Sequence, residues 1–370
     1  MSGQHMGSSR PRLGLVAAFS LLIGAGSMPS GAEAATAGEP ARVAPTEPTE
    51  PTAGDGPCST LAEPVTLTVS NNTVGTVFAP FYVALHTGAF EAAGLDVRVE
   101  NTSSSDAVPL LGRGTLDIVA GQITAGMLNA IGSGFENRWV APGFQQNPQS
   151  LAGLWVRNDW LGERSVEDFD IAELEGETIA SPTGLGGATS FAIGRLLLDV
   201  GLTLNDVEFV RLDGNEVGIA LENGQIDIGY ISDPQWTEFV DSDVVTHLLS
   251  PDNGASTGYV FGPSMKGKRD AGVAFLRVLQ DTIEHFGMDE TDWLDDPDTS
   301  AVVAEALDLP PEVLDAGVEP VFDPSLQLDP QLASDIQTIF MASELLDFDE
   351  PLPIEAVIDQ GYASDASACP

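Results

Sequence analysis

Apolar positions near the start of the folded region alternate with polar ones and then change to helical spacing. Val65-Thr66-Leu67-Thr68-Val69 has the period-two pattern of a strand. The apolar residues of 81–90 predict a helix that Gly88 interrupts and that Gly94 ends as a left-handed cap. Residues 97–99 alternate again and predict a second strand. This β-α-β order implies parallel strands joined by a right-handed crossover.

A short pattern occurs twice along the chain. Residues 112–118 (GRGTLDI) match residues 222–228 (ENGQIDI), and each copy follows a Gly-Leu turn and a strand. In each copy we expect the middle glycine to take a left-handed helix cap and the aspartate to start a buried strand. These residues are Gly114 and Gly224, and Asp117 and Asp227. The duplicated order favours two similar lobes over one extended sheet.

We therefore predict an α/β fold with two lobes. About 310 residues after the N-terminal region exceed what one hydrophobic core usually holds. Residues 61–152 are assigned to the first part of lobe 1, residues 153–242 to lobe 2, and residues 243–370 to a return into lobe 1. The return is mostly helical, with apolar residues at helical spacing in 273–286 and in 336–345. We expect both helices to brace lobe 1.

The N-terminal region has the pattern of an export signal. Arg10 and Arg12 precede an apolar run, 13–25, and Ala32-Glu33-Ala34 offers small residues for cleavage. We assign residues 1–34 to a signal peptide and residues 35–60, rich in Pro, Thr and Glu, to a flexible linker. The apolar run is shorter than the roughly 20 residues that span a bilayer. A periplasmic or cell-surface location follows, with tethering by an uncleaved segment left open.

The two cysteines fit export to an oxidising compartment. Cys58 opens the folded part and Cys369 lies next to the end, so a disulfide would join the two termini. Two free thiols are the alternative. A lipid anchor is disfavoured, because it requires a cysteine directly after the apolar run, and Cys58 lies far downstream.

The charge of the chain excludes one class of partner. Fifty-six acidic residues against 14 basic ones give a net charge of −42, so nucleic acid would be repelled and anionic lipid is disfavoured. The acids are spread along the chain rather than clustered. This favours a salty habitat over a specific cationic partner as the reason for the acidity.

Candidate ligand residues follow from the predicted sheets. In open parallel α/β sheets, ligands bind beyond the carboxyl ends of the strands. This rule selects the loops 70–78, 121–124, 181–189 and 230–236. We add Asp213, an acid at the end of a further predicted strand. The candidates are Asn71, Asn72, Phe78, Gln122, Thr124, Thr183, Gly186, Gly187, Ala188, Thr189, Asp213, Tyr230, Asp233 and Trp236.

The Gly-rich loop 181–189 is the most informative of these. Its glycines allow close approach of the backbone, and Thr183 or Thr189 can cap a helix or donate a hydroxyl. The following helix start could therefore hold an anionic or carbonyl group. The loop lacks the lysine of a phosphate-binding Walker motif, which argues against nucleotide hydrolysis. An ordinary Gly-rich turn is the alternative.

Three aromatic residues, Phe78, Tyr230 and Trp236, are predicted near the cleft and could sandwich a flat solute. Core packing is nearly as good an interpretation for Phe78 and a weaker one for Trp236. We expect Trp236→Ala to weaken solute binding without unfolding the protein.

Two acids, Asp213 and Asp233, could recognise an amine or amidine, and an equally good interpretation makes them solvated loop acids. Arg138 and Arg211 are the nearby basic residues. This scarcity of positive charge favours a solute other than a small strong anion.

Residues 78–90 (FAPFYVALHTGAF), running into Gly94-Leu95-Asp96-Val97, resemble the nitrate/taurine/sulfonate (SsuA-like) and thiamine-precursor family of ABC-transporter binding proteins. Residues 174–180 resemble the start of the second lobe in that family, and residues 220–228 its recurring helix-to-strand segment. The resemblance covers roughly residues 65–236. It implies a periplasmic-binding-protein type II fold, with two α/β lobes, a hinge and a ligand cleft. The family binds nitrate, sulfonates, aromatic sulfonates and pyrimidine precursors of thiamine, and the resemblance selects none of them.

The resemblance implies the solute-binding component of an ABC importer, a monomer that closes on a small molecule and needs no cofactor. The alternatives are an enzyme like the thiamine-pyrimidine synthases, which share the fold, and a ligand-sensing module without a transporter. The folded region holds only Lys266 and Lys268, in one loop poorly placed for a cofactor-binding lysine. Its histidines, His86, His247 and His285, show no metal-binding spacing. We therefore predict a binding protein rather than an enzyme.

Overall fold

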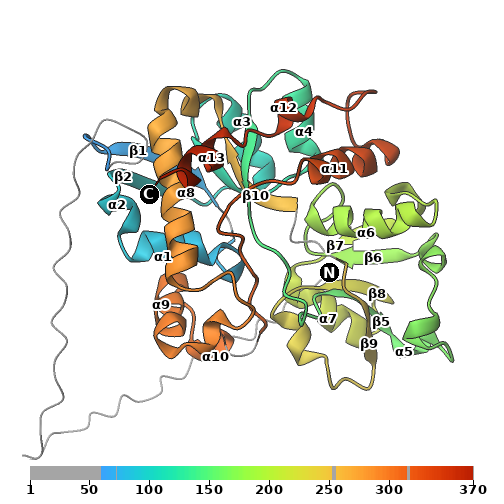
Figure 1. The fold of residues 1–370 in the computed structure, drawn as a ribbon. Helices are drawn as coiled ribbons and strands as arrows, with labels where there is room; N and C mark the ends of the chain where they lie inside the picture. The colour runs from blue at the N-terminus through green and yellow to red at the C-terminus, as the bar shows by residue number, and fades with distance from the viewer. Residues whose placement is uncertain (1–59, 72, 252–255, 315–316, 370) are drawn as a thin grey trace, which may run out of the picture. The chain divides into compact units, whose positions relative to one another are not determined.

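Two five-stranded sheets form the fold (Figure 1). The computed structural model describes residues 60–71, 73–251, 256–314 and 317–369. Within them, the strand order is β2-β1-β3-β10-β4 in the first sheet and β7-β6-β8-β5-β9 in the second. The predicted α/β fold with two lobes is confirmed. Within the same residues, no helix has the length and apolar character needed to cross a membrane.

The predicted signal peptide, 1–34, lies outside the described residues, as does all but the last residue of the predicted linker, 35–60. Cys58, the proposed partner of Cys369, lies there too, so the disulfide stays a prediction.

In the first sheet, the strands near the N-terminus are parallel. β1 pairs in parallel with both β2 and β3, whereas β10 is antiparallel to β3 and β4. The predicted β-α-β order is thus confirmed. The strands are β1 (Val65–Ser70), β2 (Leu95–Glu100), β3 (Ile118–Gln122), β4 (Arg138–Pro142) and β10 (Thr257–Phe261).

The helices of the first lobe begin and end close to the predicted positions. Gly88 separates two helices and Gly94 follows the second, with φ angles of 74° and 82° that favour glycine. The helical elements are η1 (Thr76–Phe78), α1 (Ala79–His86), α2 (Ala89–Ala92), α3 (Ser104–Gly112) and α4 (Ala125–Gly132).

The second sheet repeats the parallel arrangement. β6 pairs in parallel with β7 and β8, and β5 is antiparallel to β8 and β9. Since β9 still belongs to this sheet, the chain returns to lobe 1 later than the predicted boundary at residue 243. Sequence pattern could not separate β9 from β10, because both are short apolar runs and only their pairing differs. The strands are β5 (Gly153–Arg157), β6 (Thr178–Ser181), β7 (Glu208–Arg211), β8 (Ile228–Ile231) and β9 (Val245–Leu249).

Helices α6 and α7 connect the parallel strands of the second sheet, and short helical turns fill the remaining loops. The elements are α5 (Asn158–Leu161), η2 (Val166–Asp168), η3 (Ile171–Leu174), α6 (Ala188–Asp199), η4 (Leu204–Asp206), α7 (Gly214–Glu222) and η5 (Gln235–Glu238).

The C-terminal return supplies η7 (Pro263–Lys268), α8 (Arg269–His285), η8 (Trp293–Asp295), α9 (Pro297–Leu307), α10 (Pro311–Leu314), α11 (Pro330–Ala342), α12 (Ile354–Val357) and α13 (Gly361–Ser367). Helix α8 packs on α1 and α13, as predicted for a brace of lobe 1. Helix α11 instead packs on α6 of lobe 2, where the ring centroids of Phe340 and Phe191 lie 6.5 Å apart.

The segment after α11 contacts both lobes. Ser343 Oγ accepts a hydrogen bond from Leu204 N in lobe 2 at 3.2 Å. Asn129 on α4 of lobe 1 donates to Leu345 O and accepts from Asp347 N. The expectation that both C-terminal helices brace lobe 1 is therefore correct only for α8. The apolar spacing of a helix does not reveal which sheet the helix covers, so the sequence could not assign α11 to lobe 2.

The two copies of the internal repeat differ at their aspartates. Gly114 and Gly224 both take the predicted left-handed conformation, with φ of 73° and 66°. Asp117 is 5% exposed, but the Asp227 side chain is 56% exposed and lies 3.6 Å from Arg157. Each aspartate directly precedes a buried strand, β3 or β8, as predicted, but only the Asp117 side chain is itself buried.

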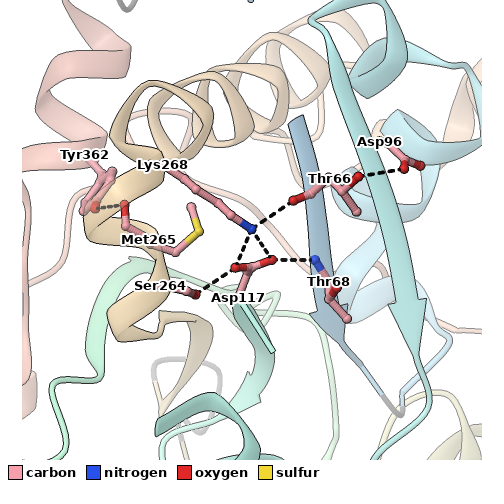
Figure 2. A network of polar contacts seen from close by, with 8 residues as sticks. All are labelled: Thr66, Thr68, Asp96, Asp117, Ser264, Met265, Lys268 and Tyr362. Carbon is pink, nitrogen blue, oxygen red and sulfur yellow. Dashed lines mark hydrogen bonds and ion pairs between the residues drawn. The ribbon is translucent and has the colours of Figure 1, made fainter. Parts of the chain in front are cut away.

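Asp117 holds the first lobe together through a buried polar network (Figure 2). Its carboxylate accepts hydrogen bonds from Thr68 N at 2.9 Å, Ser264 Oγ at 2.7 Å and Lys268 Nζ at 2.8 Å. Lys268 Nζ also donates to Thr66 O at 3.0 Å. The network joins β1 to the start of β3 and to the turn that leads into α8.

Replacing Asp117 by asparagine should reduce the free energy of unfolding by about 2 kcal/mol, because it leaves the partly buried Lys268 ammonium without its carboxylate. The matched control is Asp227→Asn in the second copy of the repeat, where an exposed pair should contribute less than about 1 kcal/mol. Urea unfolding measures both. Equal losses would contradict the structural role of Asp117.

Candidate functional site

Three adjoining cavities lie at the carboxyl ends of the parallel strands and together form a cleft lined by both lobes. Their volumes are about 600, 130 and 430 Å³, and we call them the polar, middle and apolar compartments. Thr73 of lobe 1 and Ser232 of lobe 2 line all three. Gln122 and Thr183 line the polar and middle compartments. Because these residues line more than one compartment, the three compartments adjoin, and we treat them as one cleft.

The polar compartment lies against the Gly-rich loop. Its wall includes Thr124 at the start of α4, Pro182 and Gly187 of the loop, and Arg211 at the end of β7. Arg211 is the basic side chain among the described residues that line the cleft; the other sequence candidate, Arg138, donates to Asn137 O and does not line it.

Two amides at the start of α6 already have acceptors within the protein. Ala188 N donates to Gln122 Oε1 at 3.0 Å, and Thr189 N donates to Thr183 Oγ1 at 3.3 Å. Side chains of the protein therefore compete at these two amides with the anionic or carbonyl group predicted there. Sequence could not show this, because Gln122 comes from the opposite lobe.

The middle compartment is the narrow part of the cleft. Its wall holds two rings, Phe78 and Phe144, and the hydroxyl-bearing Thr189 and Thr257. Phe78 is only 3% exposed and contacts Tyr259 edge to face, with centroids 6.0 Å apart. Both interpretations of Phe78 thus hold in part, because it belongs to the core and its surface reaches the cleft.

The apolar compartment is closed by the C-terminal return. Most of its apolar wall comes from residues beyond α8, namely Leu294, Leu309, Val313, Leu314 and Val318, and the loops after β1 and β8 add Val74, Val77 and Pro234. A Cβ on Gly317 would lie 2.8 Å from Pro234 Cβ, so the return packs tightly against lobe 2 here. The strand-end rule selected the loops after β1 and β8, which also line this compartment, but it missed the wall from the return, because the return contributes no strand there.

Two carboxyl groups, Asp233 and Glu319, line the apolar compartment. Burial raises the pKa of the Asp233 carboxyl above its usual value, although hydrogen bonds from Ser150 Oγ, at 2.7 Å, and from Trp236 Nε1 act in the opposite direction. Burial also raises the pKa of Glu319. The Ser150–Asp233 bond joins the segment between the lobes to the loop after β8.

The structure brings nine of the predicted site residues to the wall of the cleft. They are Phe78, Gln122, Thr124, Thr183, Gly186, Gly187, Ala188, Thr189 and Asp233. Asn72 lies outside the described residues.

Two of the predicted aromatic residues are core residues. Tyr230 is 1% exposed within β8, and Trp236 is 8% exposed and packs with Trp155, Phe239 and Val245. Neither lines the cleft, so the prediction that they sandwich a solute is not supported. The loop after β8 turns the Trp236 ring back onto the second sheet, which its place in the sequence does not reveal.

Two polar candidates shape loops rather than line the cleft. Asn71 Oδ1 accepts from Thr73 N at 2.7 Å and from Tyr82 OH at 3.2 Å, and this positions the loop after β1. Asp213 N donates to Glu216 Oε2 at the start of α7. Both therefore act on the local backbone.

Sequence reasoning missed Thr73, Ser232 and Phe144 as wall residues. Thr73 and Ser232 lie inside loops selected by the strand-end rule, so a broader choice within those loops would have included them. Phe144 follows β4, whose role in the cleft shows only after antiparallel pairing with β10.

A separate cavity of about 620 Å³ lies between α2 and α8, away from the strand ends. Its wall includes Thr60, the first described residue, and no loop from a strand end. We place the candidate site in the cleft, where loops from both lobes converge.

Two α/β lobes with a cleft at the carboxyl ends of their parallel strands define the periplasmic-binding-protein type II fold. Residues 75–246 match the family described as NMT1/THI5 like. No curated protein matches the chain. The family match covers both halves of the internal repeat and confirms the resemblance noted in the sequence.

Solved binding proteins share the fold. The alkanesulfonate-binding protein SsuA of Xanthomonas axonopodis pv. citri, bound to MOPS, is 18% identical with a TM-score of 0.54, over 80% of this chain and 99% of that one. The aliphatic sulphonate-binding SsuA of Escherichia coli is 17% identical with a TM-score of 0.54, over 82% and 99%. The nitrate-binding NrtA of Synechocystis PCC 6803 is 15% identical with a TM-score of 0.54, over 82% and 89%.

Because the Trp236 ring is buried in the second lobe, Trp236→Ala should reduce the free energy of unfolding by about 3 kcal/mol through the cavity it leaves. This replaces the expectation that the variant loses only solute binding. Urea unfolding measures the loss, with Trp160→Ala on the half-buried α5 as a control of smaller expected effect. Unchanged stability of Trp236→Ala would contradict the core assignment.

The raised pKa of Asp233 predicts a pH dependence of stability. Between the ordinary value of about 4 and the raised value, the folded state binds more protons than the unfolded state. The free energy contributed by this group therefore falls as pH rises through that window. Asp233→Asn removes the ionisable group. Relative to wild type, the free energy of unfolding of this variant should therefore rise when the pH is raised from about 4 to about 7. Urea unfolding at both pH values, with surface variant Asp241→Asn as control, measures this; no relative gain refutes it.

Proposed function

We propose that the protein is the extracytoplasmic solute-binding component of an ABC importer. It captures a small organic molecule in the cleft between its lobes and closes around it, and the permease then recognises the closed form. The observation that carries this proposal is the cleft whose walls come from loops of both lobes. A solute there contacts both lobes at once, so its binding energy favours closure.

The composition of the cleft supports an organic solute. A nitrate ion alone would leave the apolar compartment of about 430 Å³ without a partner. One basic side chain, Arg211, and the hydroxyls of Thr183 and Ser232 offer donors at the polar end of the described cleft. A sulfonate or a thiamine-pyrimidine-like molecule combines oxygen or nitrogen acceptors with an apolar part and suits both ends.

The positions of the reactive side chains favour binding over catalysis. Lys268 pairs with Asp117, and Lys266 Nζ lies 2.6 Å from Glu136 Oε1. His247 stacks edge to face on Trp155, and His86 faces Glu305 on the surface. Among the described residues, neither lysine nor histidine lines the cleft. An enzyme like the thiamine-pyrimidine synthases is therefore less well supported.

The solute can be identified directly. Native mass spectrometry of protein purified from its own host should show a retained small molecule. Calorimetric titration with alkanesulfonates including MOPS, with nitrate and with pyrimidines then ranks the classes. Turnover of a bound pyrimidine would instead favour the enzyme.

Ser232→Phe should abolish solute binding without unfolding the protein. Ser232 lies where the three compartments meet, so a ring there fills the cleft, and we expect at least a tenfold loss of affinity, about 1.4 kcal/mol. The control is Val200→Phe, at an exposed position at the far end of α6. Calorimetry with the retained solute measures both. Wild-type affinity in Ser232→Phe would place the solute elsewhere.

A further inference from the structure

The N-cap residue of helix α6 supplies no side-chain cap. This residue, Gly187, has no side chain, and the first amides of a helix have no partner within the helix. The helix carries twelve residues, and its first turn is buried at the cleft. A buried amide at this position needs an acceptor from elsewhere in the molecule.

The acceptor comes from the opposite lobe. Gln122, the last residue of β3, accepts from Ala188 N through Oε1 at 3.0 Å. A second bond crosses the cleft in the reverse direction, from Ala125 N of lobe 1 to Gly186 O of lobe 2 at 3.0 Å. The two bonds together form a reciprocal contact between the lobes.

The glycines of the loop make this contact possible. A Cβ on Gly187 would lie 2.8 Å from Gln122 Oε1, and one on Gly186 would lie 3.3 Å from Ala125 Cβ. Gly186 also has φ of 80°, which other residues rarely adopt. The Gly-rich sequence is thus explained by the approach of lobe 1, with no need for a ligand against the backbone.

We propose that Gln122 is a positioning residue that holds the lobes together before solute arrives, by capping α6 across the cleft. The bond from Ala188 N directs Oε1 of Gln122 toward the helix. The Nε2 hydrogens of Gln122 are therefore the part of its side-chain amide that remains to contact a solute in the cleft. No acceptor for Nε2 occurs among the described residues. The contact between the lobes does not depend on the proposed function. Only its consequence rests on that function: a solute in the cleft would contact the Gln122 amide rather than the α6 amides.

Two substitutions test the hydrogen-bond acceptor of Gln122 separately from the length of its side chain. Gln122→Glu keeps an oxygen for Ala188 N and suits the positive end of the helix dipole. Gln122→Met has similar length and removes the acceptor. Amide hydrogen exchange at Ala188 in the solute-free protein should be slow in wild type and in Gln122→Glu, and roughly tenfold faster in Gln122→Met.

The Thr189 amide is the internal control, because its acceptor, Thr183 Oγ1, belongs to the same lobe. Its exchange should be unchanged in all three proteins. Small-angle scattering should also give a larger radius of gyration for solute-free Gln122→Met than for wild type and Gln122→Glu. Equal Ala188 exchange in all three proteins, or a common radius of gyration, would overturn the proposal. Neither measurement requires a solute, so the outcome is independent of whether the proposed function holds.

Discussion

The contact between β3 and the start of α6 is the interaction on which the cleft depends. It brings a side-chain oxygen of one lobe within 3.0 Å of a helix amide of the other and requires two glycines to permit the approach. The polar and middle compartments share Gln122 as a wall, so the width of the cleft at this point is set by the same bond. Under the proposed function, this bond couples solute recognition to closure between the lobes.

The lobe that presents Gln122 is held rigid at the opposite end of the same strand. Asp117 precedes β3 and ties it to β1 and to the turn before α8 (Figure 2), whereas Gln122 ends it at the cleft. A strand anchored at its start positions the side chain at its end. The second copy of the repeat has no such anchor, since Asp227 is largely exposed beside Arg157. The two lobes share a sequence pattern, but the aspartate of the repeat anchors its strand only in lobe 1.

The return segment gives the cleft its apolar end. It places Leu294, Leu314 and Val318 beside two carboxyl groups, whose pKa values burial raises. Burial disfavours the charged form of both carboxyl groups, so their ionisation has a cost that folding must offset. The remainder of the return, α11 with the segment that follows it, covers α6 and reaches α4, so one stretch of chain contacts both lobes.

The sequence by itself determined the elements and their order. Alternation and helical spacing predicted β1, α1 and β2, and the glycines at 94, 114 and 224 have the left-handed angles that their positions indicated. The strand-end rule also selected most of the cleft loops, because the carboxyl ends of parallel strands lie at one edge whatever the residues are. These features are local in the chain or follow from strand direction, which pattern alone reveals.

Only the tertiary structure decided which side chains face the cleft. Trp236 and Tyr230 occupy suitable loop and strand-end positions but turn into the core, and the wall formed by Leu309 and Leu314 comes from a helical segment remote in sequence. The cap on α6 comes from Gln122 across the cleft, so no inspection of the Gly-rich loop could find it. Pairing between distant segments depends on how two lobes pack together, and residue spacing along one chain carries no record of that packing.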